Sequence, residues 1–203
     1  MRRLMMTLSC ACFSIAAAGI ALAADAPTVL LDNEKVRVLH LDSSAALADH
    51  PAAVVVPLSD GVLGKTGEAF WSGDAPRTPD DKASFIVVEP KPKASHSAPP
   101  AGPASAPGNA PFVGLSFKPL FENDRVSVIR GRMEVEAREG LHTHASDIVL
   151  VHLSGGVIED TAAGRTRVNH WKPGDVELEE LGSSHSARNL GPAVDAVLVT
   201  LKP

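Results

Sequence analysis

Two stretches of the sequence decide the fold: Gly140-Leu141-His142-Thr143-His144 and, about forty residues later, Gly182-Ser183-Ser184-His185-Ser186-Ala187-Arg188-Asn189. Two histidines one residue apart on a β-strand point to the same side, so both imidazoles can reach one ion. A third histidine on a later strand can complete a set of neutral nitrogen ligands. The pattern therefore predicts a divalent-metal site on His142, His144 and His185.

The sequence around these histidines is typical of short β-strands. Apolar residues recur at every second position, as in Ile148-Val149-Leu150-Val151-His152, and turns are indicated at Gly155-Gly156 and Pro173-Gly174. Helical periodicity is weak after the N-terminal segment, apart from residues 43–48. Several evenly spaced short strands in this half of the chain predict an all-β sandwich or barrel.

These features resemble the cupin superfamily, with its His-x-His motif and its later Gly-x-x-His-x-x-x-Asn motif. The resemblance covers most of residues 113–203. It implies an all-β fold of the cupin type, a double-stranded β-helix (jelly-roll) barrel, and it implies that His142, His144 and His185 are the metal ligands. It also implies that Asn189 is a structural partner rather than a ligand.

One departure from the family pattern affects the chemistry. The family usually has a glutamate ligand separated from the second histidine by three or four residues, at positions where this chain has Ile148 and Val149. Asp147 is one residue away, and two interpretations are open: a β-bulge turns it inward as a fourth ligand, or it is exposed at the surface. Without a carboxylate, three neutral imidazoles leave the double charge of the ion uncompensated. We therefore expect a small anionic ligand to bind the open positions of the metal.

The function of such a site has two interpretations. Some cupins with this pattern hold iron on three histidines and act as oxygenases, so Fe(II) is the first expectation, followed by Mn, Ni or Zn. The chain is then either a metal-dependent oxygenase acting on a small anionic substrate or a non-catalytic module that binds or senses a metal or a small acid. No separate general base or nucleophile is evident. Because cupins often dimerise, a homodimer is also open.

Other polar residues near the motifs have structural interpretations first. His152 is interpreted as a core or rim histidine and residues 170–171 as packing residues. The glutamates within residues 177–180 are interpreted as a solvated face, from which one glutamate could orient a ligating imidazole. Arg165 and Arg167 are interpreted as exposed hairpin residues that could otherwise meet an anionic substrate.

The first half of the chain resembles a diverged copy of the second. The matching blocks are residues 30–39 with 120–129, 54–63 with 149–158, 70–74 with 171–175 and 85–88 with 196–199. In this alignment Leu47 and Asp49 take the places of His142 and His144. We therefore predict a bicupin-like arrangement of a degenerate cupin-like β domain (24–89), which packs against the other half, a Pro/Ala-rich linker (90–111) and a metal-binding cupin β-barrel (112–203).

The N-terminus is typical of a targeting segment. Arg2 and Arg3 precede an apolar stretch that ends at Ala21-Leu22-Ala23. This predicts a secretory signal peptide, residues 1–23, cleaved between Ala23 and Ala24, and a periplasmic or secreted protein without a stable membrane span. The alternative is an uncleaved membrane anchor.

Composition excludes two other kinds of site. Both cysteines, Cys10 and Cys12, lie inside the predicted signal peptide, so the mature chain has no thiolate ligand and no disulfide. The formal net charge is −5, and removing the signal peptide makes the chain more acidic because it takes away two arginines. An acidic chain without a basic run has no electrostatic footprint for nucleic acid.

Overall fold

The computed structural model describes residues 26–61, 63–74, 83–92 and 112–202, and these residues form two antiparallel β-sheets. The first sheet has the strand order β1-β2-β5-β3-β4. Its strands are β1 (Thr28–Asp32), β2 (Val36–Leu41), β3 (Val54–Pro57), β4 (Phe70–Trp71) and β5 (Phe85–Pro90). Two 3-10 helices accompany it, η1 (Ser44–Asp49) and η2 (Ser72–Asp74), and η1 lies where the sequence indicated helical periodicity.

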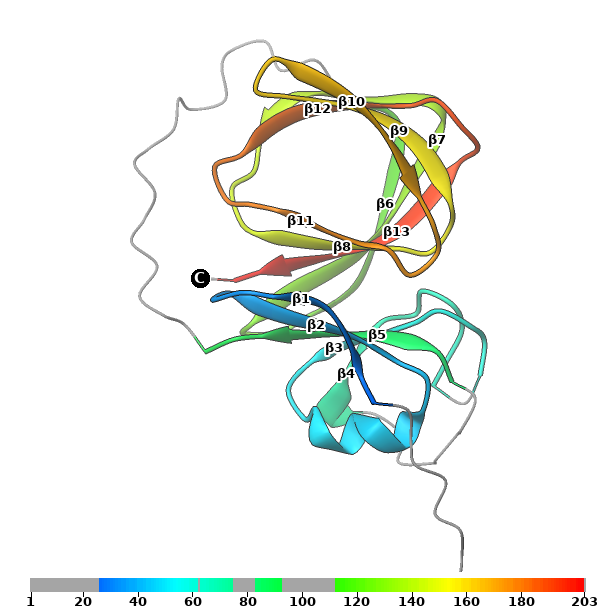
Figure 1. Ribbon diagram of the computed structural model, residues 1–203, viewed down its shortest axis with the longest axis vertical. Coiled ribbons are helices and arrows are strands. Elements are labelled where there is room, and N and C mark those ends of the chain that lie inside the picture. The colour runs from blue at the N-terminus through cyan, green and yellow to red at the C-terminus, as the bar shows by residue number, and fades with distance from the viewer. Residues whose placement is uncertain (1–25, 62, 75–82, 93–111, 203) are drawn as a thin grey trace, which may run out of the picture.

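The second sheet curls into the ring seen in Figure 1. Its order is β10-β9-β12-β7-β13-β8-β11, and β6 also pairs with β7. Its strands are β6 (Val113–Glu122), β7 (Val126–Thr143), β8 (Ile148–His152), β9 (Gly156–Ala162), β10 (Arg165–Trp171), β11 (Val176–Glu179), β12 (Ser184–Asn189) and β13 (Val194–Leu201). The expected all-β fold class with a curled antiparallel barrel is confirmed.

The first sheet repeats one part of the barrel. Its order β1-β2-β5-β3-β4 corresponds strand for strand to β6-β7-β13-β8-β11. The turn before β2 is closed by Asn33, whose side chain accepts hydrogen bonds from the backbone N–H groups two and three residues later, and Asn123 does the same before β7. Such an Asx turn starts each repeat in the same way.

The pairing register tests the alignment of the two halves. Val88 pairs with Val38 and Val54, and Val199 pairs in the same way with their aligned partners on β7 and β8. The third block is wrong, however. Trp71 pairs with Val54, and Leu178 pairs with the residue of β8 that is equivalent to Val54. Phe70-Trp71 therefore corresponds to residues 177–178 and not to 171–172. The error arose because an aromatic residue before a Gly-Asp turn was matched by letters alone.

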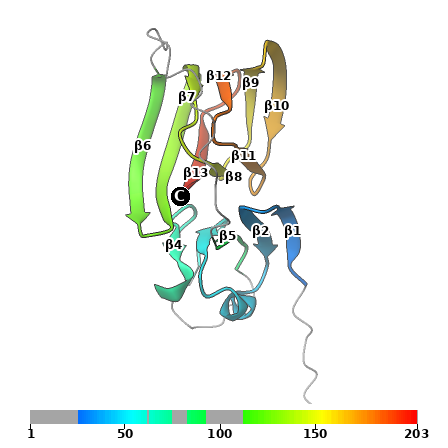
Figure 2. The ribbon, with the colours of Figure 1, turned by 90° about the vertical axis from the view of Figure 1, so that its left-hand side faces the viewer.

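The two sheets share one hydrophobic core between them. Six fully buried residues of the first sheet pack against the six equivalent residues of the barrel's outer face. These residues are Val36, Val38, Val54, Val56, Ile86 and Val88 with Val126, Val128, Val149, Val151, Val197 and Val199. Figure 1 and Figure 2 show the first sheet lying directly under β8 and β13. β-Branched side chains on two facing pleated surfaces pack well in this way.

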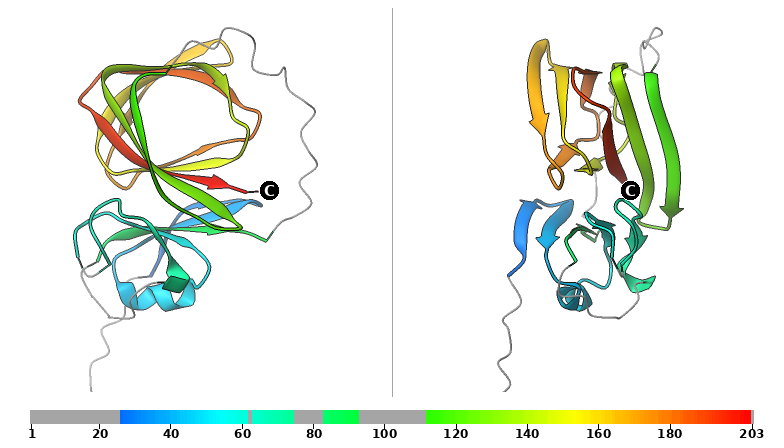
Figure 3. Two further views of the ribbon diagram at one scale, coloured as in Figure 1. Left: turned by 180° about the vertical axis from the view of Figure 1, so that it is seen from behind. Right: turned by 90° about the vertical axis from the view of Figure 1, so that its right-hand side faces the viewer.

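The opposite face of the first sheet is covered by buried apolar side chains. Leu39, Val55, Phe85 and Val87 form a second buried cluster together with Leu47 of η1. Leu47, at the place aligned with His142, therefore fills the space that is hollow in the barrel, while Asp49 is exposed. Figure 3 shows η1 closing the far side of the first sheet.

Polar contacts join the two halves at one edge of the shared core. The Lys35 ammonium donates to Asp147 Oδ1 at 2.7 Å, and the Arg125 guanidinium donates to the carbonyl oxygen of Pro90. Asp147 also accepts a hydrogen bond from the backbone N–H of Leu181 at 2.9 Å. Both proposed interpretations of Asp147 are therefore wrong: it is 8 % exposed and pairs with the other half of the chain.

The structure does not bear on the predicted targeting segment, because residues 1–23 lie outside the described residues. Most of the predicted linker also lies outside them, and its first residue, Pro90, is the last residue of β5. None of the helices in the described part of the chain is long and apolar enough to span a membrane.

A substitution in the shared core tests whether the two sheets stabilise one another. We expect Val88→Ala to lower the free energy of unfolding by about 2 kcal/mol, because two buried methyl groups are lost and a cavity remains. For a chain of this size the melting temperature should fall by about 4–8 °C in one transition. Val135→Ala, at an exposed position of β7, is the control and should change the melting temperature little. Loss of the first sheet alone, with the barrel melting unchanged, would contradict a common core.

Candidate metal centre

The structure brings the three predicted histidines together at one end of the barrel. His142 lies near the end of β7, His144 follows that strand, and His185 on β12 pairs directly with His142. The ring centroids are 4.6–5.0 Å apart. One potential ligand atom from each ring lies within 4.8 Å of the other two.

Hydrogen bonds orient two of the rings. Nδ1 of His142 donates to the carbonyl oxygen of Gly140 at 2.9 Å, and Nδ1 of His185 donates to Asp160 Oδ1 at 2.8 Å. These contacts favour the tautomer whose Nε2 carries a lone pair. The arrangement is that of metal-binding imidazoles, which usually donate their other N–H to a carboxylate or a carbonyl oxygen.

Buried nitrogen atoms without partners show that the residues fit a metal ion. Nε2 of His144 and Nε2 of His185 are buried and make no hydrogen bond within the described part of the protein. An unpaired buried polar atom costs free energy, which a coordinated cation would remove. Burial, together with the nearby His185 and His142, lowers the pKa of His144 to about 4, so this imidazole stays in the neutral form that coordinates metals.

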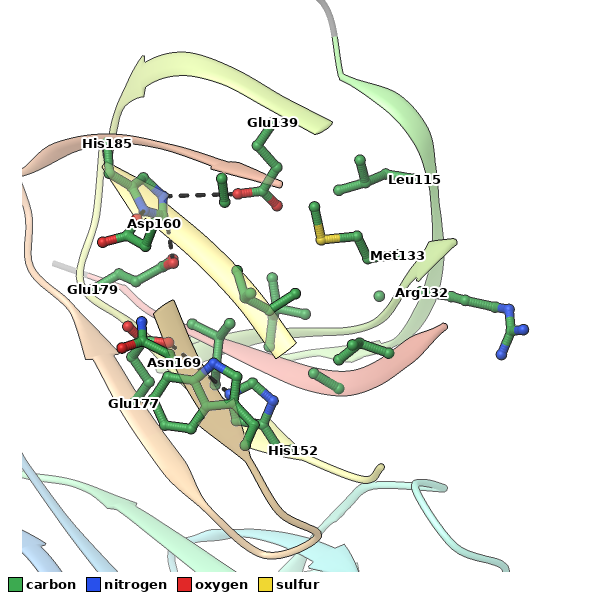
Figure 4. Close-up of a pocket in the computed structure, with 18 of the residues that line it drawn as sticks. Leu115, Arg132, Met133, Glu139, His152, Asp160, Asn169, Glu177, Glu179 and His185 are labelled. Atoms are coloured by element: carbon green, nitrogen blue, oxygen red, sulfur yellow. Dashed lines mark hydrogen bonds and ion pairs between the residues drawn. The ribbon is translucent and has the colours of Figure 1, made fainter. Parts of the chain in front are cut away.

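Two glutamates lie beside the histidines: Glu179, which was interpreted from the sequence as part of a solvated face, and Glu139, which was not singled out. Glu179 Oε1 is 3.6 Å from His185 Nε2, and Glu179 Oε2 is 3.5 Å from His144 Nδ1. Glu139 Oε2 is 3.8 Å from His185 Nε2. In Figure 4 both carboxylates point toward His185. Burial, with Glu139 next in effect, raises the pKa of Glu179 to about 8.

The prediction of a solvated glutamate face on β11 is therefore wrong for Glu177 and Glu179 and right for the exposed Glu180. The alternation of Glu177 and Glu179 with Val176 and Leu178 was the feature of the sequence that could have predicted their position. The two apolar residues pack toward the shared core, so the glutamates must face the barrel interior.

The barrel interior forms a pocket next to the histidines. Its volume is about 90 Å³, which leaves room for a small ligand. Apolar side chains make up most of its wall, namely Leu115, Phe117, Met133, Leu150, Ile158, Trp171 and Leu198. The carboxylates of Glu139, Asp160, Glu177 and Glu179 line the same pocket, as does His185.

His152 lies in the pocket wall away from the histidine cluster. Its ring stacks on Trp171 with centroids 4.3 Å apart and 13° between the planes, and its Nε2 is 4.0 Å from Glu177 Oε2. Burial lowers its pKa to about 4. The interpretation of His152 as a core histidine is confirmed, and His170, Arg165 and Arg167 are exposed.

Asn189 has the structural role that the resemblance implies. Its side chain is fully buried, and its amide nitrogen donates to the carbonyl oxygens of Met133, Glu134 and Pro192 at 2.9–3.3 Å. Its Oδ1 accepts from the N–H of Gly191. Asn189 therefore ties the end of β12 to β7 and helps to fix the strand that carries His185.

The buried His152 predicts a pH dependence of stability. Its folded-state pKa is about 4, below the ordinary 6.5, so the unfolded chain binds more protons between these values. The contribution of His152 to stability is therefore fully present above pH 6.5 and is lost as the pH drops toward 4, by about 2–3 kcal/mol. Denaturant unfolding should show that the change in unfolding free energy from pH 7 to pH 4.5 is less unfavourable for His152→Phe than for the wild type.

The comparison between variants is needed because Glu177 and Asp175 face His152, and the pKa of Glu177 is raised to about 6 by burial. His170→Gln, at an exposed position, is the control and should keep the wild-type pH dependence. An equal pH dependence in His152→Phe would rule out His152 as a source of acid lability.

Asp160 should matter for metal affinity through His185. Removing the acceptor in Asp160→Ala frees the imidazole to rotate and to change tautomer, so we expect metal affinity to fall about 10- to 100-fold. Isothermal titration with Zn²⁺ measures this. Glu159→Gln, on the neighbouring position of β9, is the control. Unchanged affinity in Asp160→Ala would show that the other contacts of His185 are sufficient.

No protein-family model and no curated protein sequence matches the chain. Among solved structures, a cupin domain from Bordetella pertussis Tohama I is 20% identical, with 46% of this chain and 99% of that chain covered and a TM-score of 0.42. KdgF from Halomonas sp. is 19% identical (44% and 80% covered, TM-score 0.38), and the Cnp3 cupin domain of Schizosaccharomyces pombe is 21% identical (46% and 69% covered, TM-score 0.39).

At these identities the likeness concerns the fold of less than half of the chain. The assignment of the barrel fold rests on the strand order of the second sheet and on the position of its three histidines. Residues 113–202 form a β-barrel of the cupin type, with a histidine cluster suited to a metal ion at one end of its pocket.

Proposed function

We propose that this chain is a metal-binding protein that holds one divalent transition-metal ion on His142, His144 and His185. The observation that carries the proposal is the convergence of three imidazoles, of which two have buried nitrogen atoms without partners. Neutral nitrogen ligands suit Fe(II), Mn, Ni and Zn, and Fe(II) is the first candidate because three histidines with open positions suit iron-dependent chemistry.

We further propose that a small molecule binds in the pocket beside the metal. The apolar walls would bury its body, and the metal would bind its polar end. An anionic group is the proposed polar end, because it can bind directly to an open position of the ion. Because four carboxylates line the same pocket, such an anion should bind only when the metal is in place.

Two activities fit this arrangement. A bound iron ion would supply dioxygen chemistry, and the protein residues would then position the substrate and exclude water, which makes the chain an oxygenase. The alternative is a binding or sensing module that takes up a metal or a small acid without turnover. Oxygen consumption by the Fe(II)-loaded protein with small organic acids separates the two, because only the oxygenase consumes oxygen in proportion to substrate.

The proposal of a metal site predicts the loss of binding when the histidines are removed. The wild-type chain, purified without chelators or loaded without oxygen, should contain about one equivalent of metal per chain by elemental analysis. The double variant His142→Ala, His185→Ala should contain almost none, while His170→Ala should match the wild type because His170 is exposed outside the cluster. Equal metal content in all three proteins would contradict the site.

We also propose that the chain is exported from the cytoplasm. It is supported by the basic start, the apolar stretch and the small residues at Ala21 and Ala23. The mature N-terminus should then be Ala24, which intact-mass measurement of the periplasmic fraction would test. A chain that keeps its first residues in the membrane fraction would favour the alternative of an uncleaved anchor.

A further inference from the structure

We propose that Glu179 of β11 is a fourth protein ligand of the metal, an inference that rests on the proposed metal site and goes beyond its three histidines. Glu179 lies three residues before Gly182 and is not one of the expected ligand positions of either histidine motif. Its carboxylate nevertheless reaches the imidazoles from a strand that neither motif includes.

The distances place the carboxylate beside His185 and His144. His185 uses its Nδ1 for Asp160, so its Nε2 is the nitrogen that faces the metal position, and Glu179 Oε1 lies 3.6 Å from that atom. Two ligand atoms that share one ion, each about 2.1 Å from it, are separated by roughly 3–3.5 Å. Only a small shift is therefore needed for Glu179 Oε1 and His185 Nε2 to bind the same ion.

The second carboxylate oxygen supports the same arrangement. Glu179 Oε2 is 3.5 Å from Nδ1 of His144, whose other nitrogen, Nε2, is buried and unpartnered. Both carboxylate oxygens therefore lie next to imidazoles, and Oε1 can bind an ion together with His185 Nε2. Accepting the Nδ1–H of a His144 ring whose Nε2 binds the same ion is a separate role, because the two nitrogens face opposite sides of the ring, and the experiment must tell the ligand role from the orienting role.

The strand register explains why Glu179 is in this place. β11 pairs with β8, and Glu179 lies directly opposite Ile148. Directly opposed residues of an antiparallel pair point to the same face, with Cβ atoms about 4.5–5.5 Å apart. Leu150 and His152, which have the parity of Ile148, line the pocket, so the Glu179 side chain also points into the barrel.

The charge environment of Glu179 lacks a cation. Its side chain is 13% exposed, and in the described ranges its ion-pair partners are His144 and His185, with no lysine or arginine among them. A buried carboxylate without a cation is costly, and a bound metal ion supplies the missing charge. Glu139 is the weaker candidate: one of its oxygens approaches one histidine nitrogen, at 3.8 Å, and its side chain is 22% exposed.

The experiment compares metal affinity in matched glutamate variants of the full mature chain. Zn²⁺ titration should show that Glu179→Gln weakens binding by about 100-fold or more, because an anionic ligand is lost. Glu139→Gln, facing the same histidine, should change affinity less than about tenfold, and exposed Glu180→Gln should not change it. Thermal melts of each variant show whether the barrel is folded.

A spectroscopic readout separates a ligand from a residue that only orients His144. At saturating Co²⁺, the visible absorption of the wild type reports the ligand set, and Glu179→Leu, which offers no oxygen, should change its band positions and intensity. Weaker binding with an unchanged spectrum would overturn the assignment of Glu179 as a ligand.

The remaining outcomes distinguish the two proposals. If Glu179→Gln binds within threefold of the wild type while His142→Ala, His185→Ala binds nothing, the ligand role of Glu179 is overturned and the three-histidine site stands. If Glu139→Gln shows the larger loss, Glu139 takes the place of Glu179. Absence of Zn²⁺ and Co²⁺ binding in the wild-type chain would overturn both proposals.

Discussion

The packing of two valine-rich sheet faces against each other is the contact on which the rest of the structure depends. Strands β2, β3 and β5 present one face to strands β7, β8 and β13, and all twelve residues between them are fully buried. Because side chains alternate along a strand, burying one face in this contact fixes which residues point to the other face. A shift of one residue in any of these strands would turn its valines away from the core and its functional side chains into it.

The two halves use their second faces in opposite ways. In the first sheet that face carries Leu39, Val55, Phe85 and Val87, and η1 closes over it with Leu47. In the barrel the equivalent face lines the pocket, where Ala196 takes the place of Phe85 and Leu198 takes the place of Val87. The described part of the first half also has no strands equivalent to β9, β10 and β12. It therefore keeps the part of the repeat that packs and lacks the part that carries His185.

Much of this could be predicted from the sequence because it depends on local patterns. The strands follow from period-two alternation, the three histidines from their spacing, and the register of three repeat blocks from letters that recur in order. What could not be predicted depends on which strands lie side by side. Glu179 meets His144 and His185 only because β11 pairs with β8, and Asp147 meets Lys35 only because the two sheets pack together.

The same limit explains the misplaced carboxylate. The family pattern places it after three or four residues that follow His144, and those positions hold Ile148 and Val149. The carboxylate instead comes from the residue directly across the strand pair, so the negative charge is present but belongs to another segment. A ligand position is a place in three dimensions, so a side chain from either of two paired strands can occupy it. A motif that follows a single strand does not detect a ligand that comes from the neighbouring strand.

The acidic interior connects folding to ion binding. Four carboxylates in one small pocket repel each other, and burial raises the pKa of Glu179 to about 8 and that of Glu177 to about 6. For a carboxyl group whose folded-state pKa is raised, folding takes up a proton, so the metal-free barrel loses stability as the pH rises from about 4.5 through these values. A divalent cation bound at the histidines would remove this penalty by pairing with the ionised carboxylates. Such binding would therefore stabilise the barrel near neutral pH in addition to satisfying the lone pairs of its histidines. The packed first sheet fixes the wall of the pocket from outside, and a bound ion would neutralise the pocket from within.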